Sequence, residues 1–122
     1  RNMANVKETL SKIMEIDGSV GCCLVDSNSG MMLGSEGGSA VNMEVAAAGN
    51  TEVVRSKRKT MKALGLADQI DDILITLGKQ YHLIRPLASN DALFIYLVLD
   101  KNRGNLAMAR HQLTTLERSL TI

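Results

Sequence analysis

Apolar residues recur at helical spacing near both ends of the chain. Met3, Val6, Leu10 and Ile13 form one narrow stripe, which predicts a helix over residues 4–16. A similar stripe predicts a last helix over residues 105–120, with Asn105 as its N-cap. Between them, the longest helical pattern covers residues 41–64 and ends at Gly65. The pattern therefore predicts one long helix between two shorter ones.

Short apolar runs separated by turn residues predict five strands, at residues 20–26, 31–34, 70–77, 80–87 and 92–100. Residues 34–39 are rich in glycine and serine, and we expect a loop there. The connections at 27–30, 78–79 and 89–91 are short enough for antiparallel hairpins. Residues 93–99 are all apolar, which indicates a central strand covered on both faces.

The predicted fold class is α+β, in the order α-β-β-α-β-β-β-α. A five-stranded antiparallel sheet would carry the long helix on one face and the two terminal helices on the other. We expect residues 1–122 to form a single domain, because the length is typical of one. Arg1 and Asn2 precede Met3, which we interpret as the natural first residue.

The long helix has more apolar and small surface than one sheet needs. Its apolar arc spans about 240°, whereas a helix lying on a sheet requires roughly 100°. The excess predicts a second contact, most simply the same helix of another copy in a homodimer. An alternative is that the excess is only alanine, which favours helix formation by itself. The predicted dimer-interface residues are Met43, Ala46, Ala47, Gly49, Asn50, Val53, Val54, Lys57, Ile73 and Ile75.

The opposite side of the same helix carries a basic stripe of Arg55, Arg58, Lys59 and Lys62. It suits an acidic partner surface, on a protein or a nucleic acid. A solvated helix face is the equally plain alternative, since cations are favourable near a helix C-terminus.

Composition narrows the possible partners. Aromatic residues make up 2% of the chain and the net charge is +1, with +3 concentrated in residues 42–65. Stacking platforms for nucleic acid require several exposed rings, so nucleic-acid binding is disfavoured.

Cys22 and Cys23 are adjacent and cannot readily pair, so we expect two buried thiols and a cytoplasmic protein. No apolar run is long enough to span a membrane.

Candidate chemistry is sparse. His82 and His111 lack partners at metal-ligand spacing, and the glycines at 34–38 lack the Lys-Ser/Thr ending of a phosphate-binding loop. Asp71 and Asp72 are adjacent in a predicted strand, where charges discourage edge aggregation. We therefore predict no catalytic residues, no metal site, no cofactor and no enzymatic activity.

Four short motifs, together with the order of elements, resemble the roadblock family of dynein light chain type, which has a profilin-like or longin-like fold. They are GCCLVDSNSG at 21–30, LGL at 64–66, YHLIRPL at 81–87 and NLAMAR at 105–110. The chain is most similar to the compact prokaryotic members, which regulate small GTPases. The resemblance implies dimerisation through the middle helix and the strand after it, residues 41–64 and 70–77.

The resemblance also implies a non-enzymatic scaffold or regulator of a Ras-like small GTPase, in cytoplasmic signalling. We expect Arg55, Arg58, Lys59 and Lys62 to contact that partner, by positioning its switch loops rather than by inserting an arginine finger. Two alternatives stay open at this point: a small-ligand sensor domain, and a weak nucleic-acid binder acting through the basic stripe.

Overall fold

The computed structural model describes residues 3–39 and 41–122. The interpretation of Arg1 and Asn2 as added residues lies outside the described part of the chain. The elements follow one another as α1 (Met3–Met14), β1 (Ser19–Asp26), β2 (Met32–Gly37), α2 (Met43–Ala63), β3 (Ile73–Thr76), β4 (Gln80–Pro86), β5 (Leu93–Asp100) and α3 (Leu106–Ser119). The predicted order of helices and strands is confirmed.

The five strands form one antiparallel sheet in the spatial order β2-β1-β5-β4-β3. β5 is the central strand, and all its residues from Leu93 to Leu99 are buried. The prediction from its uninterrupted apolar run is therefore confirmed. β2 and β3 are the two edges of the sheet.

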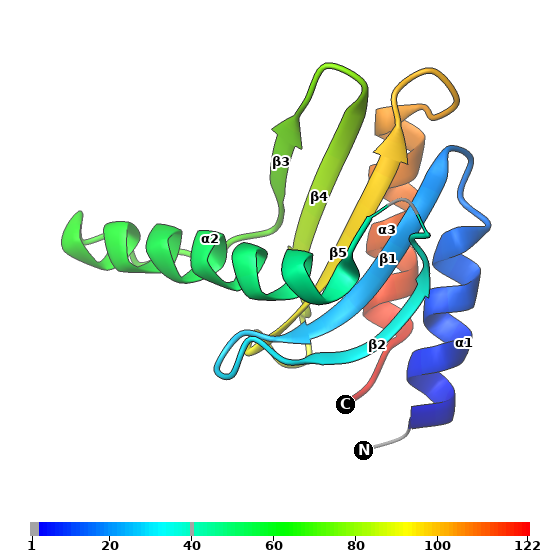
Figure 1. Ribbon diagram of the computed structural model, residues 1–122. Helices are drawn as coiled ribbons and strands as arrows, with labels where there is room; N and C mark the ends of the chain where they lie inside the picture. The colour runs from blue at the N-terminus through cyan, green and yellow to red at the C-terminus, as the bar shows by residue number, and fades with distance from the viewer. Residues whose placement is uncertain (1–2, 40) are drawn as a thin grey trace.

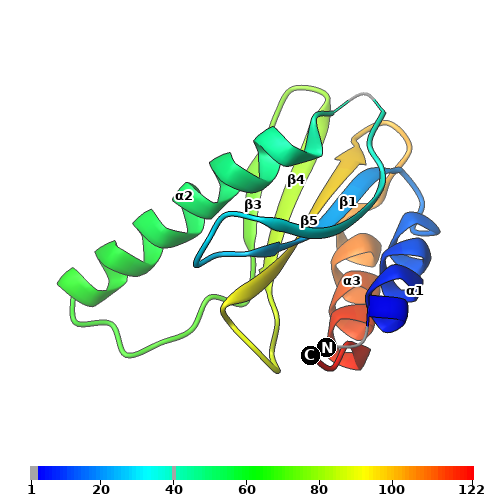
Figure 2. The ribbon, with the colours of Figure 1, turned by 60° about the horizontal axis from the view of Figure 1, so that its bottom comes forward.

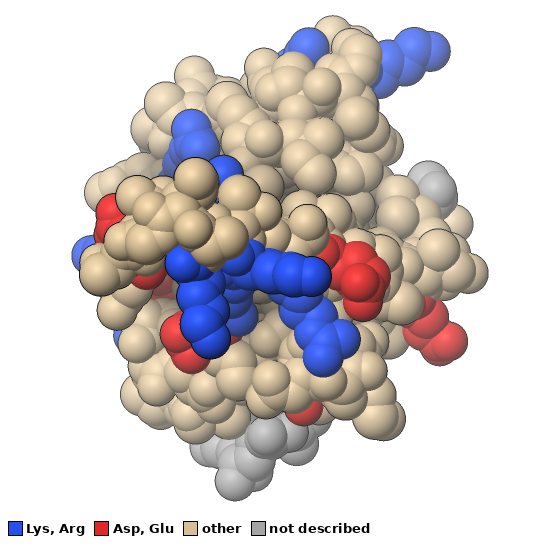
Figure 3. All heavy atoms as spheres, turned by 90° about the vertical axis from the view of Figure 1, so that its left-hand side faces the viewer, with Lys and Arg blue, Asp and Glu red and all other residues tan. Residues whose placement is uncertain are grey.

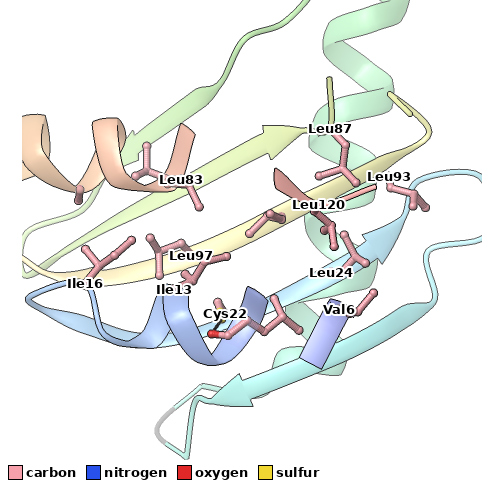
Figure 4. Close-up of a cluster of buried hydrophobic side chains, with 14 of the residues drawn as sticks. Val6, Ile13, Ile16, Cys22, Leu24, Leu83, Leu87, Leu93, Leu97 and Leu120 are labelled. Atoms are coloured by element: carbon pink, nitrogen blue, oxygen red, sulfur yellow. Dashed lines mark hydrogen bonds between the residues drawn. The ribbon is translucent and has the colours of Figure 1, made fainter. Parts of the chain in front are cut away.

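The helices cover both faces of the sheet. α2 crosses one face, whereas α1 and α3 lie side by side on the other (Figures 1 and 2). The larger core cluster lies under α1 and α3 and includes Val6, Ile13, Leu24, Leu97 and Leu120 (Figure 4). A second cluster lies under α2 and includes Val54, Phe94 and Tyr96. The predicted layer arrangement is thus confirmed.

Side-chain caps determine where two of the helices begin. Asn105 accepts a hydrogen bond from the Met108 amide, as predicted, and Asn42 does the same for the Val45 amide at the start of α2. Each cap satisfies one amide that the first helical turn leaves without a partner.

Two predicted strands differ from the observed ones by more than one residue at an end. Residues 35–37 were expected in a loop but belong to β2, which pairs with β1 as far as Gly37. A Cβ on Gly34 would lie 3.2 Å from Leu10 and Val6, so this glycine serves the close approach of α1 and does not break the strand. β3 begins at Ile73 and not at residue 70, because residues 64–72 are needed to return from the distant end of α2.

Candidate protein interface

The two halves of α2 have different surroundings. The buried residues Met43, Ala47, Thr51 and Val54 all lie in the first twelve positions and face the sheet. Residues 55–63 are all described, and none of their side chains is buried. Figures 1 and 2 show this second half extending past β3, beyond the edge of the sheet. The projecting half therefore lacks a sheet of its own chain to pack on.

Large apolar side chains are exposed at the end of α2 and at the end of β3. Leu64 is 66% exposed, Leu66 52% and Leu77 43%. Ile73, Leu74 and Ile75 of edge strand β3 are only half-buried. Exposed apolar residues gathered beside an unpaired strand edge are typical of a protein–protein contact surface.

The structure separates the predicted interface residues into two groups. Met43, Ala47 and Val54 are buried against the sheet of their own chain, so they expose little surface for a second copy. The part of the apolar arc of α2 that these three residues form therefore belongs to the monomer core. The other predicted residues keep some exposed surface and are Ala46, Gly49, Asn50, Val53, Lys57, Ile73 and Ile75.

The remaining residues of α2 divide between two flanks. Stepping 100° per residue from the buried face places Ala46, Val53, Lys57 and Leu64 on one flank, with Gly49 at its margin. This set is called the apolar flank below. A Cβ on Gly49 would have no atom within 4 Å, so the backbone is open to close approach there.

Arg55, Arg58, Lys59 and Lys62 lie on the other flank, called the basic flank below. Arg55 donates to the Asn28 carbonyl at 3.5 Å, and Arg58 donates to the Asp91 carbonyl at 2.7 Å. The basic flank therefore faces the β1–β2 turn and the β4–β5 loop. Lys and Arg side chains gather on the side that looks along the projecting half (Figure 3). The structure brings the four predicted cations together on one surface.

A polar chain lies beneath the first half of α2. The Tyr96 hydroxyl lies 2.9 Å from His82 Nδ1, and His82 Nε2 lies 2.9 Å from Gln80 Oε1. Because the amide oxygen can only accept, Nε2 carries the proton and Nδ1 accepts from Tyr96. Burial lowers the pKa of His82 and raises the pKa of Tyr96, and a hydrogen bond with Asn50 opposes the rise at Tyr96. Asn50 is thus tied to the sheet of its own chain.

Asp72 has a role that the sequence did not indicate. Its carboxylate accepts two hydrogen bonds from Arg110 of α3, at 2.7 and 3.0 Å. These bonds raise the pKa of Arg110 further. The prediction that Asp72 is simply an edge charge is therefore wrong, because the ion pair fixes the entry into β3 against α3. The two partners lie 38 positions apart, so no local pattern could reveal them.

A cleft of about 760 Å³ opens at the end of the sheet where α2, the 65–72 connection and α3 meet. Inside it, Arg85 Nε donates to Glu117 at 2.6 Å, and the Ala88 amide donates to the same carboxylate. Arg58, Lys62, Arg85 and Arg118 balance Asp68, Asp71, Asp91 and Glu117 along its walls. This balance favours neither an anionic nor a cationic ligand.

The two cysteines are poor nucleophiles where they lie. Burial raises the pKa of Cys22 and of Cys23 to about 12, so both stay protonated and unreactive at neutral pH. In residues 3–39 and 41–122, no group of three His, Cys, Asp or Glu side chains is arranged to hold a metal ion. Within the same residues, the structure contains no helix of the length and apolarity that a membrane span requires.

A scan against protein-family models gives no match, and no curated protein matches in sequence. Solved structures do match. The chain superposes on MglB of Myxococcus xanthus with a TM-score of 0.75 at 15% identity, covering 100% of this chain and 94% of that one. A Roadblock/LC7 domain from Streptomyces avermitilis gives a TM-score of 0.79 at 11% identity, with 92% and 91% covered.

The gliding protein MglB from Thermus thermophilus is also similar, with a TM-score of 0.71 at 14% identity and coverages of 97% and 92%. These likenesses extend over nearly the whole of each chain. The resemblance seen in the sequence motifs is therefore confirmed at the level of architecture, and the fold of this chain is the roadblock fold.

Proposed function

We propose that this protein is a non-enzymatic homodimer that binds a Ras-like small GTPase and regulates its nucleotide cycle or its location. The observation that carries the proposal is the second half of α2, which projects past β3 without a sheet beneath it. A second copy related by a two-fold axis would supply the missing sheet, and the first copy would supply it in return. The exposed edge of β3 lies beside this overhang and would be covered in the same step.

The contact surface of α2 in this dimer is the apolar flank, Ala46, Val53, Lys57 and Leu64 with Gly49 at its margin. Small residues at Ala46 and Gly49 let two helix backbones approach closely. Burial of Leu64 and its counterpart would remove apolar surface from water and stabilise the dimer by about 25 cal/mol per Å².

Gly49→Arg tests the dimer. A Cβ at this exposed position would have no atom within 4 Å, so the fold should persist, while a long cation on the interface margin should prevent association. Sedimentation equilibrium should show a dimer for the wild type and a monomer for Gly49→Arg. Ala48→Arg is the matched control, because Ala48 is exposed but lies toward the basic flank. A Gly49→Arg protein that stays fully dimeric would refute this assignment.

The GTPase partner is supported by the roadblock architecture and by the basic flank. A two-fold axis would double the stripe of Arg55, Arg58, Lys59 and Lys62, giving an extended cationic surface. Arg58 is already held by the Asp91 carbonyl, so the more exposed Arg55, Lys59 and Lys62 are the better candidates for direct contact.

Charge reversal tests the partner surface. Arg55→Glu/Lys59→Glu should weaken binding to a purified Ras-like GTPase of the source organism at least ten-fold in one nucleotide state. The nucleotide-exchange and hydrolysis rates of the GTPase should then lose their dependence on this protein. Lys7→Glu on α1 is the control, because this exposed cation lies on the opposite face of the sheet. Unchanged binding by the double variant would exclude the basic flank, and failure to bind any GTPase in either state would exclude the function.

A further inference from the structure

We propose that His82 makes the association of two copies sensitive to pH, with protonation of its ring weakening the dimer. This inference rests on the proposed homodimer and adds a condition under which the two copies separate. It follows from the open surface on which His82 lies, from the direction of the hydrogen bonds around its ring, and from the groups that a second copy would bring to that surface.

His82 lies on a part of the sheet that α2 leaves open. The closest backbone contacts of α2 are with β1 and β2, and Figure 1 shows the end of β3 and the start of β4 clear of it. His82 is paired with Ile75 across these two strands, and both side chains are only half-buried. Because Ile73 packs in the cluster under α2, alternation places Ile75 and His82 on that same face. The projecting half of α2 from a second copy would cover this surface.

The hydrogen bonds around His82 run in one direction. Asn50 donates to the Tyr96 hydroxyl, since its bond lowers the pKa of Tyr96 and a phenolate can only accept. The hydroxyl donates to His82 Nδ1, and His82 Nε2 donates to Gln80 Oε1, both at 2.9 Å. The rings of His82 and Tyr96 meet edge to face, with centroids 5.4 Å apart. A neutral imidazole with its proton on Nε2 completes this chain.

A second proton on the ring breaks the chain at Tyr96. Protonated Nδ1 is a donor, so it and the hydroxyl would each direct a hydrogen at the other. The hydroxyl would have to turn and accept from Nδ1, and its own hydrogen would need a new acceptor in the core, because Tyr96 is only 2% exposed. Among the residues that the structure describes, no carboxylate forms an ion pair with His82 to offset the charge.

A second copy would make the charged ring still less favourable. Its projecting half would remove the water that reaches the open side of His82. The apolar flank that it brings carries one charge, that of Lys57, which is also positive. The groups around the ring within its own chain, Asn50, Ile75, Gln80 and Tyr96, carry no charge at neutral pH. The pKa of His82 should therefore be lower in the dimer than in the monomer, so the dimer loses stability as the pH falls.

The dissociation constant at two pH values tests the inference. In sedimentation equilibrium, the wild-type constant should rise about ten-fold or more from pH 7.5 to pH 5.5, because each dimer contains two His82 rings. His82→Gln should reduce this rise to less than about three-fold, since the glutamine side chain stays neutral and its oxygen can still accept from Tyr96. A constant that does not change with pH, or an equal rise in His82→Gln, would overturn the inference.

His111→Gln is the matched control for this measurement. His111 is the second histidine of the chain, and it is exposed on α3, across the sheet from α2. This variant should keep the full wild-type rise. A rise that disappears in His111→Gln and persists in His82→Gln would assign the pH dependence to the wrong face for this inference.

The titration of the ring gives a second measurement that does not depend on the dissociation constant. Nitrogen-15 chemical shifts of His82 should place the proton on Nε2 at neutral pH. The ring should then titrate at a lower pH in the wild-type dimer than in monomeric Gly49→Arg, because protonation and association are linked. Titration at the same pH in both proteins would overturn the inference.

The outcomes separate this inference from the proposed function. A wild-type protein that is monomeric at every pH and concentration would refute the dimer itself. A dimer that Gly49→Arg dissociates, but whose dissociation constant is the same at pH 7.5 and pH 5.5, would refute only the role of His82.

Discussion

The first and second halves of α2 belong to one continuous helix but serve different surfaces. Residues 43–54 carry all the buried side chains of the helix and only two charges, Glu44 and Glu52. Residues 55–63 carry five cations and lie past the edge of the sheet. The comparison shows that helical periodicity identifies an apolar side, whereas the extent of the sheet beneath decides how much of that side is core.

The two halves should differ most in how much the free energy of unfolding falls when the same side chain is placed in each. Ala47→Gln should lower the free energy of unfolding by roughly 3 kcal/mol, because it overfills the contact with the sheet and buries an amide without a partner. Ala63→Gln should change it by less than about 0.5 kcal/mol, since Ala63 is exposed. Urea unfolding of both proteins in the monomeric Gly49→Arg background measures the difference. Equal losses would break the distinction between a core half and a projecting half.

Two threonines give a finer comparison, because each donates its hydroxyl to the carbonyl four residues earlier. Thr51 bonds Ala47 and is buried, whereas Thr60 bonds Ser56 and is exposed. Thr51→Ala should cost about 1 kcal/mol through the lost buried methyl group. Thr60→Ala should be neutral or stabilising by a few tenths of a kcal/mol, because alanine has the higher helix propensity. Thermal unfolding of both variants in the Gly49→Arg background measures the two effects. A larger loss of stability for Thr60→Ala than for Thr51→Ala would contradict the prediction.

The smallest expected effect is on the pH dependence of stability, and it concerns His82, which lies beneath the first half of α2. Its pKa in the folded protein lies below the ordinary value of 6.5, because burial disfavours the charged ring. The unfolded chain therefore binds more protons as the pH falls below about 6.5, and folding loses stability in that window. The ring is partly exposed, so we expect a loss of no more than about 0.5 kcal/mol.

His82→Gln should flatten this part of the pH profile, as followed by urea unfolding between pH 7.5 and 5. A profile identical to that of the wild-type protein would assign the dependence to other groups.

Local patterns were sufficient for most of the architecture. The period of the apolar residues identified three helices, and the seven apolar residues of β5 identified the central strand. The strand bounds at β2 and β3 were wrong for tertiary reasons. Residues 35–37 have the glycine and serine content of a loop, but they pair with β1. Residues 70–72 have a strand-like pattern, but they belong to the connection that returns from the end of α2.

The candidate surface was predictable only in part. Arg55, Arg58, Lys59 and Lys62 fall on one flank because helix geometry alone dictates it. Met43, Ala47 and Val54 pack on the sheet of their own chain, and a helical wheel cannot show which part of an apolar arc does so. Leu64 and Leu66 were noted only as parts of the LGL motif, and the exposed Leu77 gave no signal, since isolated apolar residues are common on surfaces.

The sequence by itself determined the elements, their order and the excess apolar surface of the long helix, because these depend on contacts within a few residues. Only the tertiary structure decided that half of α2 overhangs the sheet, that Asp72 binds Arg110 and that Arg85 binds Glu117. Each of these depends on where distant segments come to lie. The physical reason is that periodicity reports which side of an element avoids water, and the rest of the fold decides what covers it.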